Sequence, residues 1–177
     1  MKSFLDRYAR VLDRIGRVEL GVAQGCLGAI VVCIFAQVVS RYGLNRPLVW
    51  VEEFATYCFL WGTFLGASVG LKRGLHIRVE TFLGRLPAGA REAIRFATRL
   101  AIGVFCLLLV VNGVTAMLIF EWRQRTIALP VELPRYLFFS GPLIVASASM
   151  LLTVLHDLLA AAAGRPVHRG SGSGALA

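Results

Sequence analysis

Four long stretches of the sequence contain no charged residue, and they limit the fold more than any other feature. They span residues 20–39, 54–71, 100–120 and 136–155. At a rise of 1.5 Å per residue, helices of these lengths reach about 27–32 Å, which is enough to cross a hydrocarbon core of about 30 Å. Backbone groups inside a bilayer must pair within their own segment, so each stretch is predicted to be a transmembrane helix.

The composition agrees with a membrane protein. Hydrophobic residues make up 57% of the 177 residues and charged residues 16%, whereas soluble domains have about 45–50% and about 25%. We therefore expect an all-α integral membrane protein with a single four-helix membrane domain at residues 1–163. The tail at 164–177 is rich in Gly, Ser and Ala, and we expect it to be disordered.

The distribution of Lys and Arg predicts the orientation of the chain. Of the 19 basic residues, 14 lie in the N-terminal segment, in the connection between the second and third stretches, and in the tail. The other two connections, at 40–53 and 121–135, hold five. The positive-inside rule then places both termini in the cytoplasm and the two short loops outside. This bias also explains the net charge of +9, so we expect no nucleic-acid partner.

The N-terminal segment at residues 2–17 is amphipathic. Its apolar residues recur at helical spacing, and five basic residues lie opposite them. A basic amphipathic helix beside a span normally lies in the headgroup plane. We therefore predict an interfacial helix that anchors the chain on anionic lipid; the alternative is a brace that packs against a partner subunit.

The cytoplasmic connection at 72–99 is also amphipathic. Pro87 within it predicts the start of a helix that continues without a break into the third span. Arg91, Arg95 and Arg99 recur every four residues on this helix. They would form a basic ridge just below the bilayer, in contact with lipid headgroups or with a partner.

Nothing in the four stretches predicts catalysis or ion transport by the chain alone. Transporters and pumps hold ionisable residues inside the membrane, and the four stretches contain none. A haem would require histidines deep in the helices, whereas the three histidines lie at cytoplasmic ends or in the tail. The four cysteines lie inside predicted spans, which favours packing over disulfides or metal binding. We therefore predict no enzyme activity, no cofactor and no metal.

Small residues recur at a spacing of four in two of the stretches. This spacing lets helix backbones approach closely, so we expect tight helix contacts there. The pattern leaves open whether the partner helix belongs to this chain or to another subunit. Asn112, near the middle of the third stretch, is expected to form an interhelical hydrogen bond. The small residues are Gly62, Gly66 and Gly70 in the second stretch, and Gly21, Gly25 and Ala29 in the first.

Polar and aromatic residues gather in the first outward loop and at the start of the second stretch. Trp50 is typical of the membrane interface. Glu52 and Glu53 lie at a helix N-terminus, where the helix dipole favours acids, and Arg41 and Arg46 lie near enough in the sequence to neutralise them. These effects do not explain why two adjacent acids are present.

Several motifs, taken as a set, resemble the small membrane subunit (DctQ-like) of tripartite ATP-independent periplasmic (TRAP) transporters. The resemblance covers residues 15–160, with the tail outside it. The motifs are Arg41…Pro47-x-x-Trp50-x-Glu52-Glu53, Trp61-x-x-Phe64-Leu65-Gly66-Ala67, Lys72-x-x-x-His76-Ile77, and Thr126-x-Ala128-Leu129-x-Val131-x-x-Pro134-x-x-Tyr136.

The resemblance implies a bacterial inner-membrane protein that pairs with a large, multi-span transport subunit. In this family the large subunit holds the substrate and sodium sites, and the small subunit packs against its fixed scaffold. A periplasmic solute-binding protein delivers an organic acid, such as a C4-dicarboxylate, sialic acid or a related carboxylate. The chain would then be an accessory scaffold that does not bind substrate. Its structural core or subunit interface would include Arg41, Trp50, Glu52, Glu53, Trp61, Gly62, Gly66, Gly70 and His76.

Two other functions stay open at this level. A stand-alone four-helix transporter or channel, active as a homo-oligomer, would support flux without a partner, although the uncharged spans disfavour it. A membrane anchor of a redox enzyme would require a bound haem or quinone.

Overall fold

The computed structural model describes residues 2–73, 87–128 and 132–162, and every regular element in these ranges is helical. Four helical segments are long and apolar enough to cross a membrane, which confirms the predicted all-α, four-helix membrane fold. The elements are α1 (Lys2–Gly43), α2 (Val49–Lys72), α4 (Ala88–Ala116), the π-helix η1 (Met117–Glu121), the 3-10 helix η2 (Arg135–Leu137) and α5 (Ser140–Ala162).

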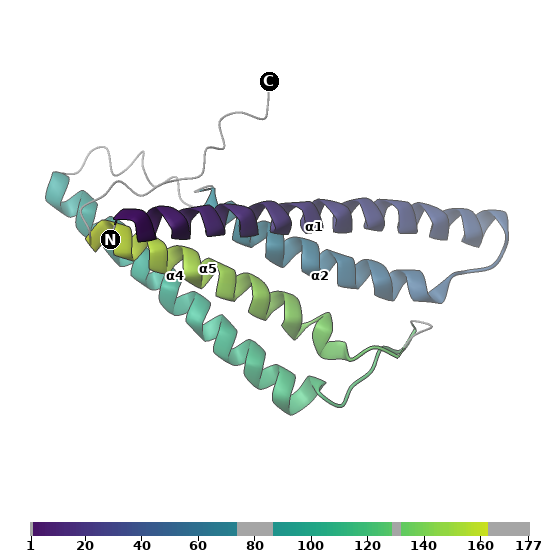
Figure 1. Ribbon diagram of the computed structural model, residues 1–177. Helices are drawn as coiled ribbons and strands as arrows, with labels where there is room; N and C mark the ends of the chain where they lie inside the picture. Colours follow the sequence, from purple (N-terminus) through teal and green to yellow (C-terminus); the bar gives the residue numbers. More distant parts are fainter. Residues whose placement is uncertain (1, 74–86, 129–131, 163–177) are drawn as a thin grey trace, which may run out of the picture.

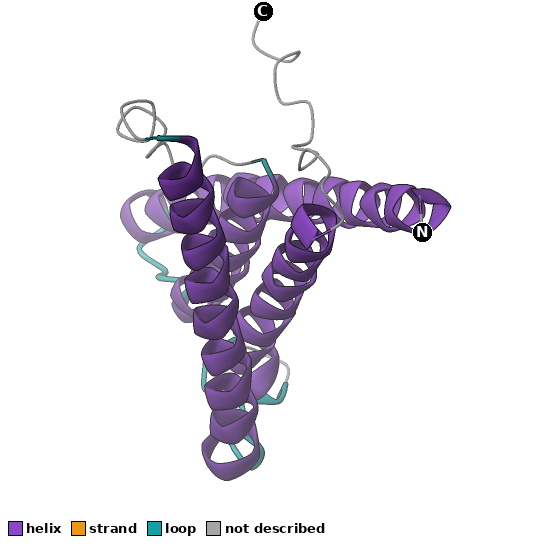
Figure 2. Cartoon of the chain, turned by 90° about the vertical axis from the view of Figure 1, so that its left-hand side faces the viewer, coloured by secondary structure: helices purple, strands orange, loops and turns teal. Residues whose placement is uncertain are grey.

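The long helices form two hairpins, α1 with α2 and α4 with α5 (Figure 1). The hairpins meet mainly through α2 and α5, so that α1 and α4 lie on the outside of the bundle. Figure 2 shows that the described elements are helices joined by loops. The first part of α1 contacts the second half of α5 through Tyr8 and His156, and the hairpins diverge toward the opposite end (Figure 1). We call the end with the N-terminus the inner end, and the end with the two short connections the outer end.

Burial differs strongly between the helices. In the most apolar 18-residue window of α1, 6% of the residues are buried inside the chain, against 39% in α5. A helix that is apolar all round and buried on almost no side suits a lipid or protein neighbour rather than water. Helix α1 therefore presents most of its surface to whatever surrounds the chain.

Helices α4 and α5 approach each other closely at glycines. A Cβ atom on Gly113 would lie 2.9 Å from Cγ1 of Ile144, and one on Gly103 would lie 3.3 Å from Cγ1 of Val154. Both distances are too short for an ordinary contact. The absence of a side chain at these two positions therefore sets how near the helices can come.

The predicted start of the third membrane helix is confirmed, since α4 begins at Ala88, directly after Pro87, and continues for 29 residues. Helix α1 ends where the backbone carbonyl of Ser40 accepts hydrogen bonds from the amides of Leu44 and Arg46, at 3.2 and 3.1 Å. Asn45 has a φ of 52°, a left-handed conformation that Asn tolerates better than most residues, and it turns the chain toward α2.

The N-terminal segment differs from the sequence prediction. Residues 2–17 are helical, but they form the first part of α1 rather than a separate interfacial helix. The ring of Tyr8 contacts the ring of His156 edge-on, its hydroxyl donates to the carbonyl oxygen of Leu152 at 2.8 Å, and Leu5 is buried. The apolar side of the segment therefore packs at least partly on α5 of the same chain. No proline interrupts residues 2–43, so nothing forces the helix to break.

Parts of two predicted segments lie outside the described residues. They are positions 74–86 of the cytoplasmic amphipathic segment and the tail at 164–177.

Candidate interaction site

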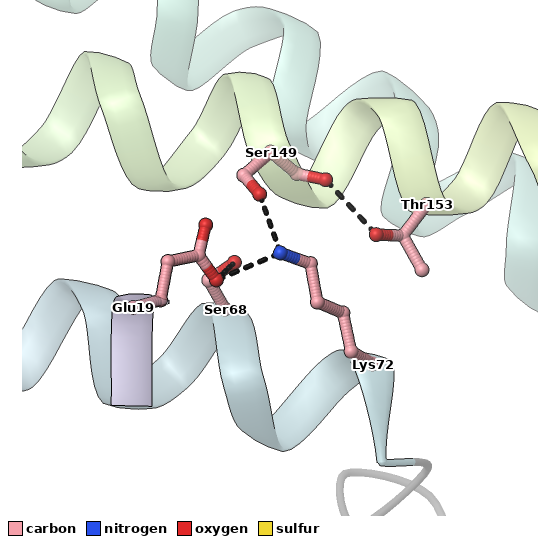
Figure 3. A network of polar contacts seen from close by, with 5 residues as sticks. All are labelled: Glu19, Ser68, Lys72, Ser149 and Thr153. Carbon is pink, nitrogen blue, oxygen red and sulfur yellow. Dashed lines mark hydrogen bonds and ion pairs between the residues drawn. The ribbon is translucent and has the colours of Figure 1, made fainter. Parts of the chain in front are cut away.

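A buried polar cluster joins three helices near the inner end of the bundle (Figure 3). The Lys72 Nζ atom of α2 lies 2.7 Å from Oε2 of Glu19 on α1, and it also donates to Oγ of Ser149 on α5 at 2.7 Å. Ser68, one turn before Lys72, donates to the same Glu19 oxygen at 3.0 Å. We call these four residues the inner polar cluster.

The inner polar cluster corrects the expectation that the membrane helices bury no ionisable group. Glu19 and Lys72 flank the uncharged stretches by one residue, and both helices continue far enough to include them. Their side chains are 6% and 10% exposed. Opposite charges in contact offset part of the cost of leaving water, which allows the pair to be buried when hydrogen bonds satisfy it further.

The chemistry of this cluster is structural. The ammonium group of Lys72 is held by a carboxylate and a hydroxyl, and the hydroxyl of Thr153 donates to the Ser149 carbonyl at 2.9 Å. One carboxylate oxygen, Glu19 Oε1, is buried without a hydrogen-bond partner. Across the described ranges, no group of three or more His, Cys, Asp and Glu residues is placed to hold a metal ion. The cluster is suited to fixing helices relative to one another.

A second polar cluster lies at the outer end, and Glu52 is at its centre. Its Oε1 atom lies 3.1 Å from a guanidinium nitrogen of Arg41 and 3.3 Å from the amide nitrogen of Gln37. Both partners belong to α1. Glu52 therefore joins the start of α2 to the end of α1, and it does so in a partly exposed position.

Glu53 makes a different set of contacts. Its carboxylate accepts hydrogen bonds from the backbone amides of Ala128, at 2.6 Å, and Ile127, at 3.2 Å, and from the hydroxyl of Tyr57. Successive residues on a helix point about 100° apart. The two adjacent acids therefore serve two different neighbours, since Glu52 binds α1 and Glu53 binds the connection between α4 and α5. This answers the question that the sequence leaves open.

Aromatic residues complete the contact between α2 and the connection that joins α4 to α5. The ring of Tyr57 stacks on Phe138 with centroids 4.1 Å apart. The indole nitrogen of Trp61 donates to the carbonyl oxygen of Leu137 at 3.2 Å. Together with Glu53, these residues hold the loop across the outer end, where the hairpins diverge.

Helix α5 begins at a cap supplied by the preceding membrane helix. The Oε2 atom of Glu121 accepts hydrogen bonds from the hydroxyl of Ser140, at 2.7 Å, and from its backbone amide, at 3.3 Å. A carboxylate at a helix N-terminus is favoured by the helix dipole. The contact joins the end of η1, which follows α4 directly, to the start of α5 on the other side of the connection.

The predicted glycine series divides between inside and outside. A Cβ on Gly62 would lie 3.6 Å from Cβ of Cys26 and 3.7 Å from the carbonyl oxygen of Ala23, so this position faces α1. By contrast, among the residues that the structure describes, no atom lies within 4 Å of such a Cβ at Gly66, Gly21 or Gly25. The described chain therefore does not cover these three positions.

The remaining predicted residues lie apart from both clusters. Trp50 is 38% exposed, and its ring contacts that of Phe54 edge-on. Gly70 is half-buried on α2.

Of the predicted basic ridge, Arg95 is exposed and Arg99 is half-buried on α4. His76 and the side chain of Arg91 lie outside the described part of the chain.

Several contacts were missed by reasoning from the sequence. Asn112 does not reach another helix, because its amide donates to the Leu108 carbonyl of its own helix at 2.7 Å.

Glu19 could have been singled out from the sequence, since it is the sole acid between Arg17 and Arg41 and directly precedes an apolar run. Nothing in the sequence around Ser149 indicates its role, because that role comes from its contact with Lys72 on another helix.

Comparisons with known proteins show one matching family and several similar proteins. A family model described as "Tripartite ATP-independent periplasmic transporters, DctQ component" matches residues 30–164. The chain is 32% identical over 106 residues to the C4-dicarboxylate TRAP transporter small permease protein DctQ of Vibrio cholerae. The aligned residues cover 60% of this chain and 46% of that protein. It is 26% identical over 111 residues to the sialic acid TRAP transporter small permease protein SiaQ of the same organism. Here the aligned residues cover 63% of this chain and 61% of that protein.

A third similarity is to a larger protein. The chain is 28% identical over 91 residues to the sialic acid TRAP transporter permease protein SiaT of Haemophilus influenzae. The match covers 49% of this chain and 15% of SiaT, so most of SiaT lies outside it. The chain spans about half the length of the small permease proteins that it matches.

Proposed function

The chain belongs to the DctQ component family of tripartite ATP-independent periplasmic transporters, and on this premise we propose that it is the small accessory subunit of such a transporter. The family is the one that the sequence motifs indicate. In this proposal the chain packs against a large permease subunit, acts as a scaffold for it, and does not itself bind the transported solute.

The main support is the use that the chain makes of its charged residues. Glu19 and Lys72 neutralise each other between helices, and Glu53 binds backbone amides of the outer loop. A transport site needs charged or polar groups that are free to bind a solute or an ion inside the membrane. These groups instead join α1, α2 and α5 and hold the connection between α4 and α5, which is what a scaffold requires.

The solute class is proposed from the relatives. Two of them are named for C4-dicarboxylate and for sialic acid, and both solutes are carboxylates. We propose that the complex imports an organic acid of this kind, that a periplasmic binding protein delivers it, and that a sodium gradient drives the uptake. The outer loops held by Glu52 and Glu53 are the part of the chain placed to meet the binding protein.

The large partner is supported by the SiaT match. A segment similar to this chain makes up 15% of that permease protein, so in that relative the segment is part of a much larger permease. We propose that this chain performs the same role as a separate subunit. With 14 basic residues on one side and five on the other, it would lie in the bacterial inner membrane with both termini in the cytoplasm.

Reconstitution tests the proposal. The chain, a large permease subunit and a binding protein are purified and combined in proteoliposomes with a sodium gradient, and uptake of a labelled dicarboxylate or sialic acid is measured. We expect uptake with all three components and none when the chain or the large subunit is left out. Uptake by proteoliposomes that contain this chain alone would instead establish a stand-alone transporter.

A further inference from the structure

A groove lies along the outside of the α1–α2 hairpin, at the middle of α2. Its volume is about 340 Å³. Leu27 and Phe59 line it and are 64% and 61% exposed, so it opens away from the chain. Gly62 also lines it, and a Cβ at this position would lie 3.6 Å from Cβ of Cys26 on α1, so the two helices lie close together there.

Two polar side chains line this apolar groove, Gln24 on α1 and Thr63 on α2. Within the described ranges the amide of Gln24 makes no hydrogen bond, in contrast to that of Asn112, which binds its own helix. Thr63 is also unbonded there, although Thr56 and Thr115, two other exposed helical threonines, donate to the carbonyl four residues earlier.

An amide without a partner inside a membrane favours a polar neighbour. Lipid chains offer no hydrogen bond, so they would leave Gln24 unsatisfied. At this depth only a helix can bring a polar side chain without exposing its own backbone groups to lipid. Side chains such as Ser, Thr, Asn and Gln form this type of bond between membrane helices.

We propose that the groove between α1 and α2 receives a transmembrane helix of the large permease subunit, with Gln24 and Thr63 hydrogen-bonded to a polar side chain of that helix. This inference rests on the proposed function, because it takes the large subunit as the partner. It adds the face by which the two subunits join. Gly66, Gly21 and Gly25, which lack near neighbours, lie on the same two helices.

The first experiment measures affinity. The isolated chain is titrated against the purified large subunit in detergent, with the variants Gln24→Leu and Thr63→Val. Loss of one interhelical hydrogen bond should weaken binding about three- to tenfold. The matched control is Asn112→Leu, which removes an exposed amide that is already bonded to its own helix, and its affinity should equal that of the unaltered chain.

The second experiment identifies the occupant. A photo-crosslinking amino acid, p-benzoylphenylalanine, replaces Leu27 in the complete complex, and the crosslinked product is identified by mass. We expect a product with the large subunit. A product with a second copy of this chain, or with lipid alone, would overturn the inference.

The two proposals fail in different ways. If the unaltered chain does not bind the large subunit, the proposed function fails, and the inference falls with it. If the unaltered chain binds, but Gln24→Leu and Thr63→Val bind equally well, the groove is not the interface and the proposed function stands. The thermal stability of each isolated variant shows that it is folded, and we expect it to equal that of the unaltered chain.

Discussion

The Nζ atom of Lys72 lies 2.7 Å from a carboxylate oxygen of Glu19 and equally near the hydroxyl of Ser149. One side chain therefore joins α2 to both α1 and α5, at the end of the bundle where the hairpins meet. A change at Lys72 should weaken contacts within the α1–α2 hairpin and contacts between the two hairpins.

Lys72→Met should lower the free energy of unfolding by about 3 kcal/mol, because it leaves the carboxylate of Glu19 buried and uncompensated. Circular dichroism during denaturant unfolding in detergent micelles measures this loss. Arg73→Met is the matched control, since Arg73 is the neighbouring basic residue and is exposed. The double variant Glu19→Gln/Lys72→Met should recover part of the loss. Equal stability of Lys72→Met and the unaltered chain would contradict the structural role of the pair.

Glu53→Gln should loosen the connection between α4 and α5. The carboxylate accepts hydrogen bonds from the amides of Ile127 and Ala128, and bonds to a charged group are worth about 1.5–3 kcal/mol. We expect these two amides to exchange with solvent at least about tenfold faster, as measured by hydrogen–deuterium exchange. Glu52→Gln removes the adjacent acid, which binds α1 instead, and should leave their exchange rates unchanged.

Gly113→Ala should destabilise the α4–α5 hairpin. The added methyl group would lie 2.9 Å from Ile144 Cγ1, and overpacking of this kind costs about 1–3 kcal/mol. A lowered Tm in detergent would show this. Gly28→Ala is the comparison, because no atom of the described ranges lies within 4 Å of its Cβ position, and its Tm should not fall. A Gly113→Ala chain as stable as the unaltered one would mean that the helices separate at little cost.

Gly66→Leu should separate folding from assembly. No atom of the described chain lies within 4 Å of a Cβ at this position, so the isolated protein should keep its Tm. If Gly66 faces the large subunit, leucine there should reduce the amount of this chain that co-purifies with it. The affinity of the binding protein for its solute should not change. Normal assembly and transport with leucine at this position would remove Gly66 from the interface.

The sequence predicts helices well wherever local chemistry decides them. Uncharged stretches locate the four spans, and Pro87 locates the start of α4 to within one residue. The continuity of α1 was not predicted, because amphipathic spacing in residues 2–17 shows which face is apolar but not what covers it. In the structure at least part of that face packs on α5, near Tyr8.

The sites were harder to predict, because they depend on residues far apart in the chain. The need for Glu53 becomes visible only when Ile127 and Ala128, more than 70 positions later, arrive beside it. Likewise, Gly113 stands outside any series of small residues, and its importance comes from Ile144 on the facing helix. Spacing along one helix cannot report the shape of its neighbour.

The length of α1 also limits how the protein can sit in a bilayer. Its 42 residues extend about 63 Å, roughly twice the hydrocarbon thickness. Even at a steep tilt of about 40°, only about 26 residues fit within the hydrocarbon, which leaves about 16 beyond it. That number equals the length of the basic segment at 2–17. Tyr8, whose ring contacts His156 just after the predicted span at 136–155, would then lie at the edge of the hydrocarbon, where a ring with a polar tip is favoured.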